Sequence, residues 1–128
     1  MNTRPLIHVV DDDDSLRTAL LRLLGASGYE AQGYASTGDF LLSPPPDRPG
    51  CLLLDVRMPG PSGLDLQAAL QRQGIGLPIV FLSGYADVVT SVRAMKAGAV
   101  DFLTKPVTRE DLMDALHRAL ERDALQRQ

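Results

Sequence analysis

The sequence predicts an α/β protein in which a mostly parallel sheet is covered by helices on both faces. Short apolar runs alternate five times with longer stretches that place apolar residues at helical spacing. The apolar runs are nearly continuous rather than alternating with polar residues, which is typical of parallel strands that are buried on both faces. Five βα units in series favour this architecture, because each crossover lays a helix against the sheet.

These patterns also place the individual elements. The expected strands are 6–10, 30–34, 51–55, 79–83 and 101–104. The first expected helix is capped by Ser15 and runs to about Gly25. Further helices are expected at 37–42, 64–73 and 87–97, and a last helix is expected to begin near Thr108. Proline and glycine indicate loops at 43–50 and 58–63. We therefore expect one domain over residues 1–128, with a core of about residues 5–122, and with residues 123–128 as a helix end or the start of a linker.

Composition and charge argue against several classes of function. The net charge is −3 and lysine and arginine do not cluster, so we expect no direct contact with nucleic acid. No apolar stretch reaches transmembrane length and no signal peptide precedes the first strand, which indicates a cytoplasmic protein that does not bind a membrane. The lone Cys51 fits a reducing compartment and is expected to be a small buried side chain. His8, inside the first strand, is expected to be a partly buried structural residue.

Polar side chains follow four of the five predicted strands. Asp11 and Asp12 open a run of four aspartates after the first strand, Asp55 and Ser83 end the third and fourth, and Lys105 follows the fifth. Because ligands of open α/β sheets bind at the carboxyl ends of the strands, these groups are expected on one rim. Each alone has an ordinary interpretation as a turn, a cap or a surface charge. Together they offer oxygen ligands for Mg²⁺, a carboxylate nucleophile, a hydroxyl and a cation, which is the set that phosphoryl transfer uses.

The same residues closely resemble the receiver domain of two-component response regulators, and in particular the FixJ subfamily of transcriptional regulators. The resemblance covers essentially the whole chain and rests on four segments: VVDDD at 9–13, LDVRMPG at 54–60 followed by Ser62-Gly63, FLSG at 81–84, and KAGAVDFLTKP at 96–106. It implies a flavodoxin-like, doubly wound (βα)5 fold with a five-stranded parallel sheet in the order 2-1-3-4-5.

The resemblance also assigns the acceptor and the metal ligands. Asp55 is the expected phosphoacceptor. Asp11, Asp12, Asp55 and the backbone carbonyl of Arg57 are the expected ligands of Mg²⁺ (or Mn²⁺). Val10 is the last apolar residue of its strand, which is why we expect Asp11 and Asp12 to point into the site. The remaining two aspartates of the run, 13 and 14, are expected to begin the turn and to favour the helix N-terminus.

Five further positions match the switch apparatus of receivers. Ser83 is expected to donate its hydroxyl to a phosphoryl oxygen, and Lys105 to pair first with the acceptor and then with the phosphate. Gly84 leaves space beside Ser83. Phe102 stands at the position of the switch aromatic, and a cis bond is expected before Pro106.

By this resemblance, the chain is a signalling switch rather than an enzyme that turns over a substrate, although it takes part in its own phosphorylation and dephosphorylation. The expected partners are a cognate sensor histidine kinase and a second copy of the chain once it is phosphorylated. Two alternatives stay open for the output: a single-domain regulator, or the receiver of a longer protein with a DNA-binding domain after Gln128. The bistable element is expected to comprise the loop after Ser83, the helix 87–97 and Phe102.

Three alternatives use the same fold or chemistry. A haloacid-dehalogenase-type hydrolase requires a second aspartate two residues after the nucleophile, where this chain has Arg57. A flavin-binding module requires a hydroxyl- and glycine-rich loop after the first strand, where this chain has four aspartates. A pseudo-receiver that is never phosphorylated is disfavoured because every expected site position is filled.

Overall fold

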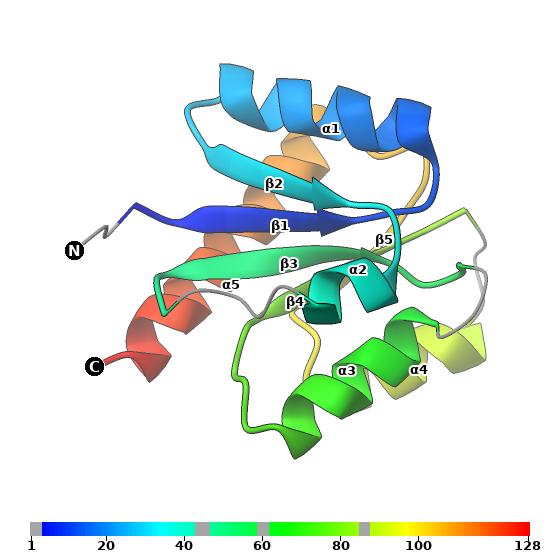
Figure 1. Ribbon diagram of the computed structural model, residues 1–128, viewed down its shortest axis with the longest axis vertical. Helices are drawn as coiled ribbons and strands as arrows, with labels where there is room; N and C mark the ends of the chain where they lie inside the picture. Colours follow the sequence, from blue (N-terminus) through cyan, green and yellow to red (C-terminus); the bar gives the residue numbers. More distant parts are fainter. Residues whose placement is uncertain (1–3, 43–46, 59–61, 85–87) are drawn as a thin grey trace.

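Five parallel strands form one sheet in the order β2-β1-β3-β4-β5 in the computed structural model, which describes residues 4–42, 47–58, 62–84 and 88–128 (Figure 1). The strands are β1 (Leu6–Val10), β2 (Glu30–Tyr34), β3 (Gly50–Asp55), β4 (Ile79–Ser83) and β5 (Asp101–Thr104). All neighbouring strands pair in parallel. The predicted doubly wound fold and its strand order are confirmed.

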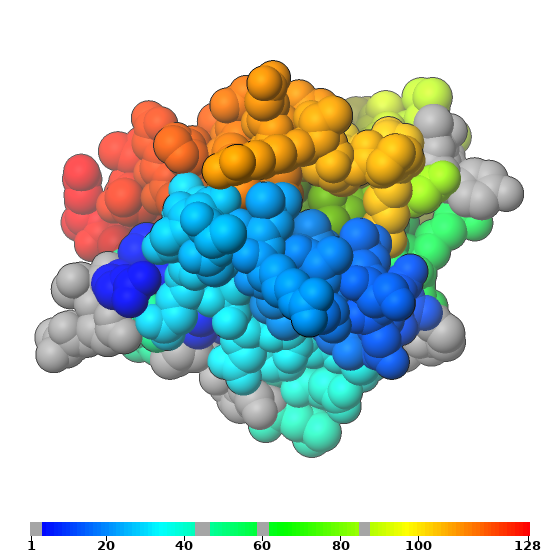
Figure 2. All heavy atoms as spheres, turned by 90° about the horizontal axis from the view of Figure 1, so that it is seen from above, coloured from blue at the N-terminus to red at the C-terminus, as the bar shows by residue number. Residues whose placement is uncertain are grey.

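Helices cover both faces of this sheet. They are α1 (Asp14–Ala26), α2 (Thr37–Leu42), α3 (Gly63–Arg72), α4 (Val88–Lys96) and α5 (Arg109–Gln126). Residues of α1 and α5 pack into one apolar cluster, and residues of α2, α3 and α4 pack into a second cluster on the opposite face. Figure 2 shows α1, in blue, beside α5, in orange to red.

The three central strands explain the continuous apolar runs of the sequence. Every residue of β1, β3 and β4 is buried, since successive side chains point to opposite faces and both faces carry helices. Ile7 and Val9 enter the cluster under α1 and α5, whereas Val10 enters the cluster under α3 and α4. Cys51 is fully buried in the first cluster, as expected for a small apolar side chain.

Several element boundaries differ from the predicted ones by one or two residues. The prediction that Ser15 caps the first helix is wrong: the N-cap is Asp13, whose side chain accepts a hydrogen bond from the backbone N–H of Leu16. β3 begins one residue earlier than predicted, at Gly50, and α3 is shifted one residue toward the N-terminus. Residue 87, the predicted start of the fourth helix, lies outside the described part of the chain.

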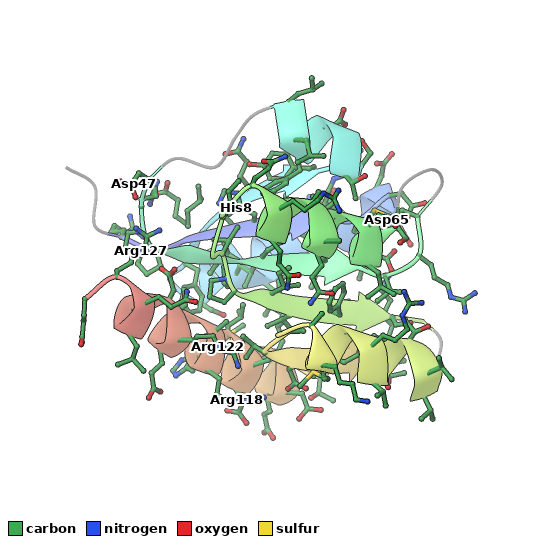
Figure 3. All side chains as sticks on the ribbon, turned by 90° about the horizontal axis from the view of Figure 1, so that it is seen from below. His8, Asp47, Asp65, Arg118, Arg122 and Arg127 are labelled. Atoms are coloured by element: carbon green, nitrogen blue, oxygen red, sulfur yellow. The ribbon has the colours of Figure 1, made fainter. Side chains whose placement is uncertain are left out.

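The C-terminal end of α5 is fastened to the start of β3. The buried Asp123 carboxylate accepts a hydrogen bond of 3.0 Å from the backbone N–H of Gly50 and one of 2.9 Å from Arg127 Nε. Arg127 also lies 3.1 Å from the Asp47 carboxylate, and Figure 3 shows this pair at the end of α5. Residues 123–126 are the last turn of α5, and within this turn the buried Asp123 makes the contact with β3.

His8 is a buried structural residue of β1 that contacts two other rings. Its Nδ1 and the Tyr34 hydroxyl are 3.1 Å apart and share a hydrogen bond, while the Phe40 ring meets it edge-on. Burial, with a smaller contribution from the charge of Arg48, lowers the pKa of His8 from its ordinary value of 6.5 to about 4. The ring is consequently neutral in the folded protein at neutral pH.

We expect His8 to lower the free energy of unfolding by about 1 kcal/mol between about pH 7.5 and about pH 5.5. In this window the unfolded chain protonates the imidazole and the folded chain does not, so the unfolded state binds more protons and stability falls as the pH falls. Urea unfolding across this range should show a shallower pH dependence for His8→Gln, which does not titrate. The same slope for both proteins would contradict the prediction.

Candidate functional site

The parallel register brings the predicted site residues to one rim of the sheet. Asp55 ends β3 beside Leu82 of β4, and Ser83 ends β4 beside Thr104 of β5. The backbone N–H of Lys105 donates a 2.7 Å hydrogen bond to the carbonyl of Ser83, which holds the chain after β5 against the end of β4. The ends of β3, β4 and β5 therefore meet at one edge.

Three carboxylates converge at this edge. Asp11, Asp12 and Asp55 each offer an oxygen, and these oxygens all lie within 4.8 Å of one another. Asp11 is 1% exposed and Asp55 is 6% exposed, whereas Asp12 is exposed to solvent. The four consecutive aspartates thus have different roles. Asp11 and Asp12 belong to the cluster, whereas Asp13 caps α1 and Asp14 forms an ion pair with Arg17.

Lys105 is the cation that faces this cluster. Its Nζ lies 3.1 Å from Asp11 Oδ2 and 3.4 Å from Asp55 Oδ2. Burial disfavours the ammonium form, but the hydrogen bond to Asp11 and the charges of Asp11 and Asp55 outweigh burial and raise the pKa of Lys105. The side chain is therefore fully charged at neutral pH.

Asp55 lies where its charged form is disfavoured. Burial, followed by the negative charge of Asp11, raises the pKa of the Asp55 carboxyl. Lys105 and the backbone N–H of Arg57, which donates to Asp55 Oδ1 over 3.2 Å, offset part of this rise. Among the described residues, one ammonium, that of Lys105, pairs with a cluster of three carboxylates, so this edge of the sheet can accommodate a further cation.

These donor atoms fit Mg²⁺. The cluster offers only oxygen ligands, which are the ligands that Mg²⁺ prefers. Mg²⁺ is usually bound by one or two carboxylates and keeps several waters, and this cluster has two buried carboxylates and one that faces solvent. Asp11, Asp12 and Asp55 would hold the ion. A contribution from the backbone carbonyl of Arg57 remains a prediction.

Of the residues of the expected switch, Ser83 lies at this edge and Phe102 lies two residues before the end of β5. Ser83 is buried at the end of β4, and the position of a side chain on Gly84 would be open space. Phe102 is partly buried on β5, with its ring centroid 6.1 Å from that of Phe81. The Lys105–Pro106 peptide bond is cis.

Two residues help to shape the site in ways that the sequence did not predict: Arg17 was not noted, and Gly63 was noted only as part of a matching segment. Arg17 of α1 donates to the backbone carbonyl of Asp11 over 2.8 Å, which ties α1 to the end of β1. Gly63 begins α3 so close to Asp55 that a Cβ at this position would lie 2.6 Å from the Asp55 carbonyl oxygen. The spacing of Arg17 from Asp14 indicates a surface ion pair only, because nothing local signals the contact with Asp11.

Residues 7–117 match the family described as "Response regulator receiver domain". The chain belongs to this family. Nodulation protein W of Bradyrhizobium diazoefficiens is 46% identical over 127 residues, which cover 99% of this chain and 56% of that protein. Transcriptional regulatory protein FixJ of Azorhizobium caulinodans is 41% identical over 120 residues, which cover 94% of this chain and 57% of that protein. A crystal structure of FixJ-N superposes with a TM-score of 0.86 at 37% identity, covering 94% of this chain and 96% of that one.

These relatives confirm the resemblance to the FixJ subfamily and to transcriptional regulators. As a receiver domain, the chain is a signalling switch of the two-component type, which phosphorylation controls. It spans about half the length of the curated relatives it matches. No helix in the described part of the chain has the length and apolar character needed to cross a membrane.

Proposed function

We propose that this receiver domain accepts a phosphoryl group on Asp55 from a cognate sensor histidine kinase and so controls an output, namely transcription, from the cytoplasm. One observation carries the proposal: the buried Asp55 carboxylate shares one edge of the sheet with two other carboxylates and the Lys105 ammonium. A DNA-binding domain that lies outside this chain would provide the output, since FixJ of Azorhizobium caulinodans is a transcriptional regulatory protein of greater length.

The transfer requires Asp55 to be ionised and its surroundings to tolerate added negative charge. A carboxylate oxygen of Asp55 attacks phosphorus, the P–N bond of the kinase phosphohistidine breaks, and the leaving imidazole keeps that electron pair. Lys105 lies within 3.4 Å of the acceptor, where it neutralises charge on the transferred oxygens. Ser83 donates its hydroxyl to one of these oxygens. When bound by the three aspartates, Mg²⁺ supplies the remaining positive charge.

Incubation with Mg²⁺ and acetyl phosphate, or with a phosphorylated kinase, tests this proposal. One phosphoryl group should be added, it should be stable in acid and labile in base as an acyl phosphate is, and mass spectrometry should map it to Asp55. A phosphoryl group on serine or histidine, or none in the presence of Mg²⁺, would refute the assignment.

The output surface is the exposed face of α4 next to β5. Val88 and Val89 are 73% and 68% exposed, and Val92 and Met95 are also exposed, so α4 presents apolar side chains to solvent. Such a face on a signalling domain is suited to a protein partner, and a second copy of the same surface can bury it symmetrically. Phe102 on the adjacent strand links this face to the acceptor site as Ser83 moves toward the phosphate and the ring turns inward.

Phosphorylation is therefore expected to strengthen dimerisation. Sedimentation velocity should show a shift toward dimer when beryllofluoride, a phosphate mimic, is added with Mg²⁺. Val92→Asp should abolish the shift by placing a charge in the interface, whereas Leu42→Asp, at an exposed leucine of α2, should not. Dimers that survive Val92→Asp would place the interface elsewhere. Unchanged association, together with unchanged amide exchange from Gly84 to Phe102, would contradict the switch.

A further inference from the structure

Each hydrogen-bonding group of Asp11 has a partner. Its backbone N–H donates to the carbonyl of Tyr34 over 3.1 Å, which joins the end of β1 to the end of β2. Its carboxylate accepts a hydrogen bond from the backbone N–H of Asp13 at Oδ1 (2.9 Å) and from Lys105 Nζ at Oδ2 (3.1 Å). Its backbone carbonyl accepts from Arg17 Nη1 over 2.8 Å. The sheet edge and the turn thus hold the other groups, and a side chain of α1 holds the carbonyl.

The Arg17 side chain is itself held at both its stem and its head. It is 18% exposed. α1 lies alongside β2 (Figure 1), and the Arg17 stem passes over Gly33 of that strand, where a Cβ would lie 3.2 Å from Arg17 Cγ and 3.1 Å from Cδ. At the head, Nη2 donates to Oδ1 of the exposed Asp14. A long side chain that is fixed in this way has lost most of its rotamer freedom, so it presents Nη1 at one defined place.

The Asp11 carbonyl is the oxygen of the peptide unit that leads into Asp12. Because a peptide unit is planar, a hydrogen bond to this oxygen fixes the direction in which Asp12 leaves the strand. The Asp12 carboxylate is exposed, and it has no hydrogen bond or ion pair to any described residue. Its place within 4.8 Å of the Asp11 and Asp55 oxygens is therefore set through the backbone.

We infer that Arg17 is a positioning residue for the metal site: it holds the Asp11–Asp12 peptide so that the Asp12 carboxylate meets the other two, and it thereby raises the affinity for Mg²⁺. This inference rests on the proposed function, because that proposal assigns Mg²⁺ to the three aspartates. Mg²⁺ demands near-ideal octahedral geometry, so a ligand that is free to turn away binds it less tightly. Side chains that orient metal ligands without touching the ion typically contribute about ten- to hundredfold to the affinity.

The charge of Arg17 acts in the opposite direction, which separates positioning from simple electrostatics. A guanidinium near a cation site repels Mg²⁺, so its removal would tighten binding if charge alone mattered. If Arg17 only fastened α1 to the sheet, its loss would lower the free energy of unfolding and leave the Mg²⁺ affinity of the folded chain unchanged. Positioning instead predicts that the affinity falls.

Arg17→Met tests the inference, because methionine keeps an unbranched stem over Gly33 and removes the donors of the guanidinium. Titration with MgCl₂, followed by NMR through the amide signals of the three aspartates of the cluster, gives the Kd of the folded chain. We expect this Kd to rise about tenfold over that of the native chain. Without metal, the carbonyl carbon resonance of Asp11 should shift in the variant, since this carbonyl has lost the hydrogen bond from Arg17.

Two matched variants keep the contact with Asp11. Asp14→Ala removes the ion-pair partner of Arg17 but leaves Nη1 on the Asp11 carbonyl. Arg22→Gln removes one positive charge from an exposed position of the same helix. Since exposed charges are screened and contribute little, both variants should bind Mg²⁺ within about twofold of the native chain.

The outcomes distinguish this inference from the proposed function. A native chain that does not bind Mg²⁺ would overturn the metal site and the role of Arg17 together. If the native chain binds Mg²⁺ and Arg17→Met has an unchanged or lower Kd, the role of Arg17 alone is overturned, whatever the stability of the variant. If Arg17→Met does not fold, Arg17→Gln provides the same comparison, because its amide nitrogen ends two bonds short of the position of Nη1.

Discussion

Asp55→Asn is expected to abolish phosphorylation by acetyl phosphate and by a kinase, with no detectable incorporation where the native chain takes up one phosphoryl group. An amide oxygen is a poor nucleophile, and the other carboxylate that pairs with Lys105, that of Asp11, is assigned to the metal and not to the phosphoryl group. The measurement is intact-mass spectrometry before and after incubation with Mg²⁺ and the donor.

Loss of folding would not explain this result. Burial and the charge of Asp11 raise the pKa of Asp55, so the charged carboxylate is disfavoured in the folded state and its neutral replacement relieves that cost. Asp55→Asn should accordingly be at least as stable as the native chain in thermal unfolding without metal. Asp14→Asn, on the exposed first turn of α1, is the control that should still be phosphorylated. Undiminished labelling of Asp55→Asn would place the acceptor elsewhere.

Asp12→Ala is expected to remove most of the stabilisation that Mg²⁺ confers on the fold and to block phosphorylation. An ion that binds only the folded state at one hundred times its Kd stabilises it by about 2.7 kcal/mol. Asp12 is the exposed member of the carboxylate cluster, so its removal withdraws a ligand without opening a cavity in the core. Urea unfolding with and without Mg²⁺ measures the difference.

Asp14→Ala provides the matched control, because Asp14 belongs to the same run of aspartates but pairs with Arg17 outside the cluster. It should keep both the stabilisation by Mg²⁺ and phosphorylation. The effect of Mg²⁺ should also weaken as the pH falls, beginning at a higher pH than for an ordinary carboxyl, because Asp55 has a raised pKa and a protonated carboxyl is a poor metal ligand. Equal losses for the two variants would mean that the ion is held by a different part of the run.

The sequence by itself determined the elements and the chemistry at their ends. The strands were predictable because burial on both faces leaves a continuous apolar run, as in CLLL before Asp55. The polar rim was predictable because the carboxyl ends of parallel strands share one edge, so the residue that follows each apolar run is placed there whatever the details of packing. The strand order came from the family resemblance, since local patterns do not state which strands pair.

Tertiary structure alone decided the features that depend on contacts between distant segments. The Asp123 carboxylate reaches the backbone N–H of Gly50 across 73 positions of the chain, and Gln67 reaches Ala94 across 27. Neither contact is predictable from the sequence, because hydrophobic periodicity identifies the face that a helix buries but not the partner of a polar group on that face. The contact of Arg17 with the carbonyl of Asp11, just after β1, is of the same kind, since it joins α1 to the end of that strand and nothing in the local pattern signals it.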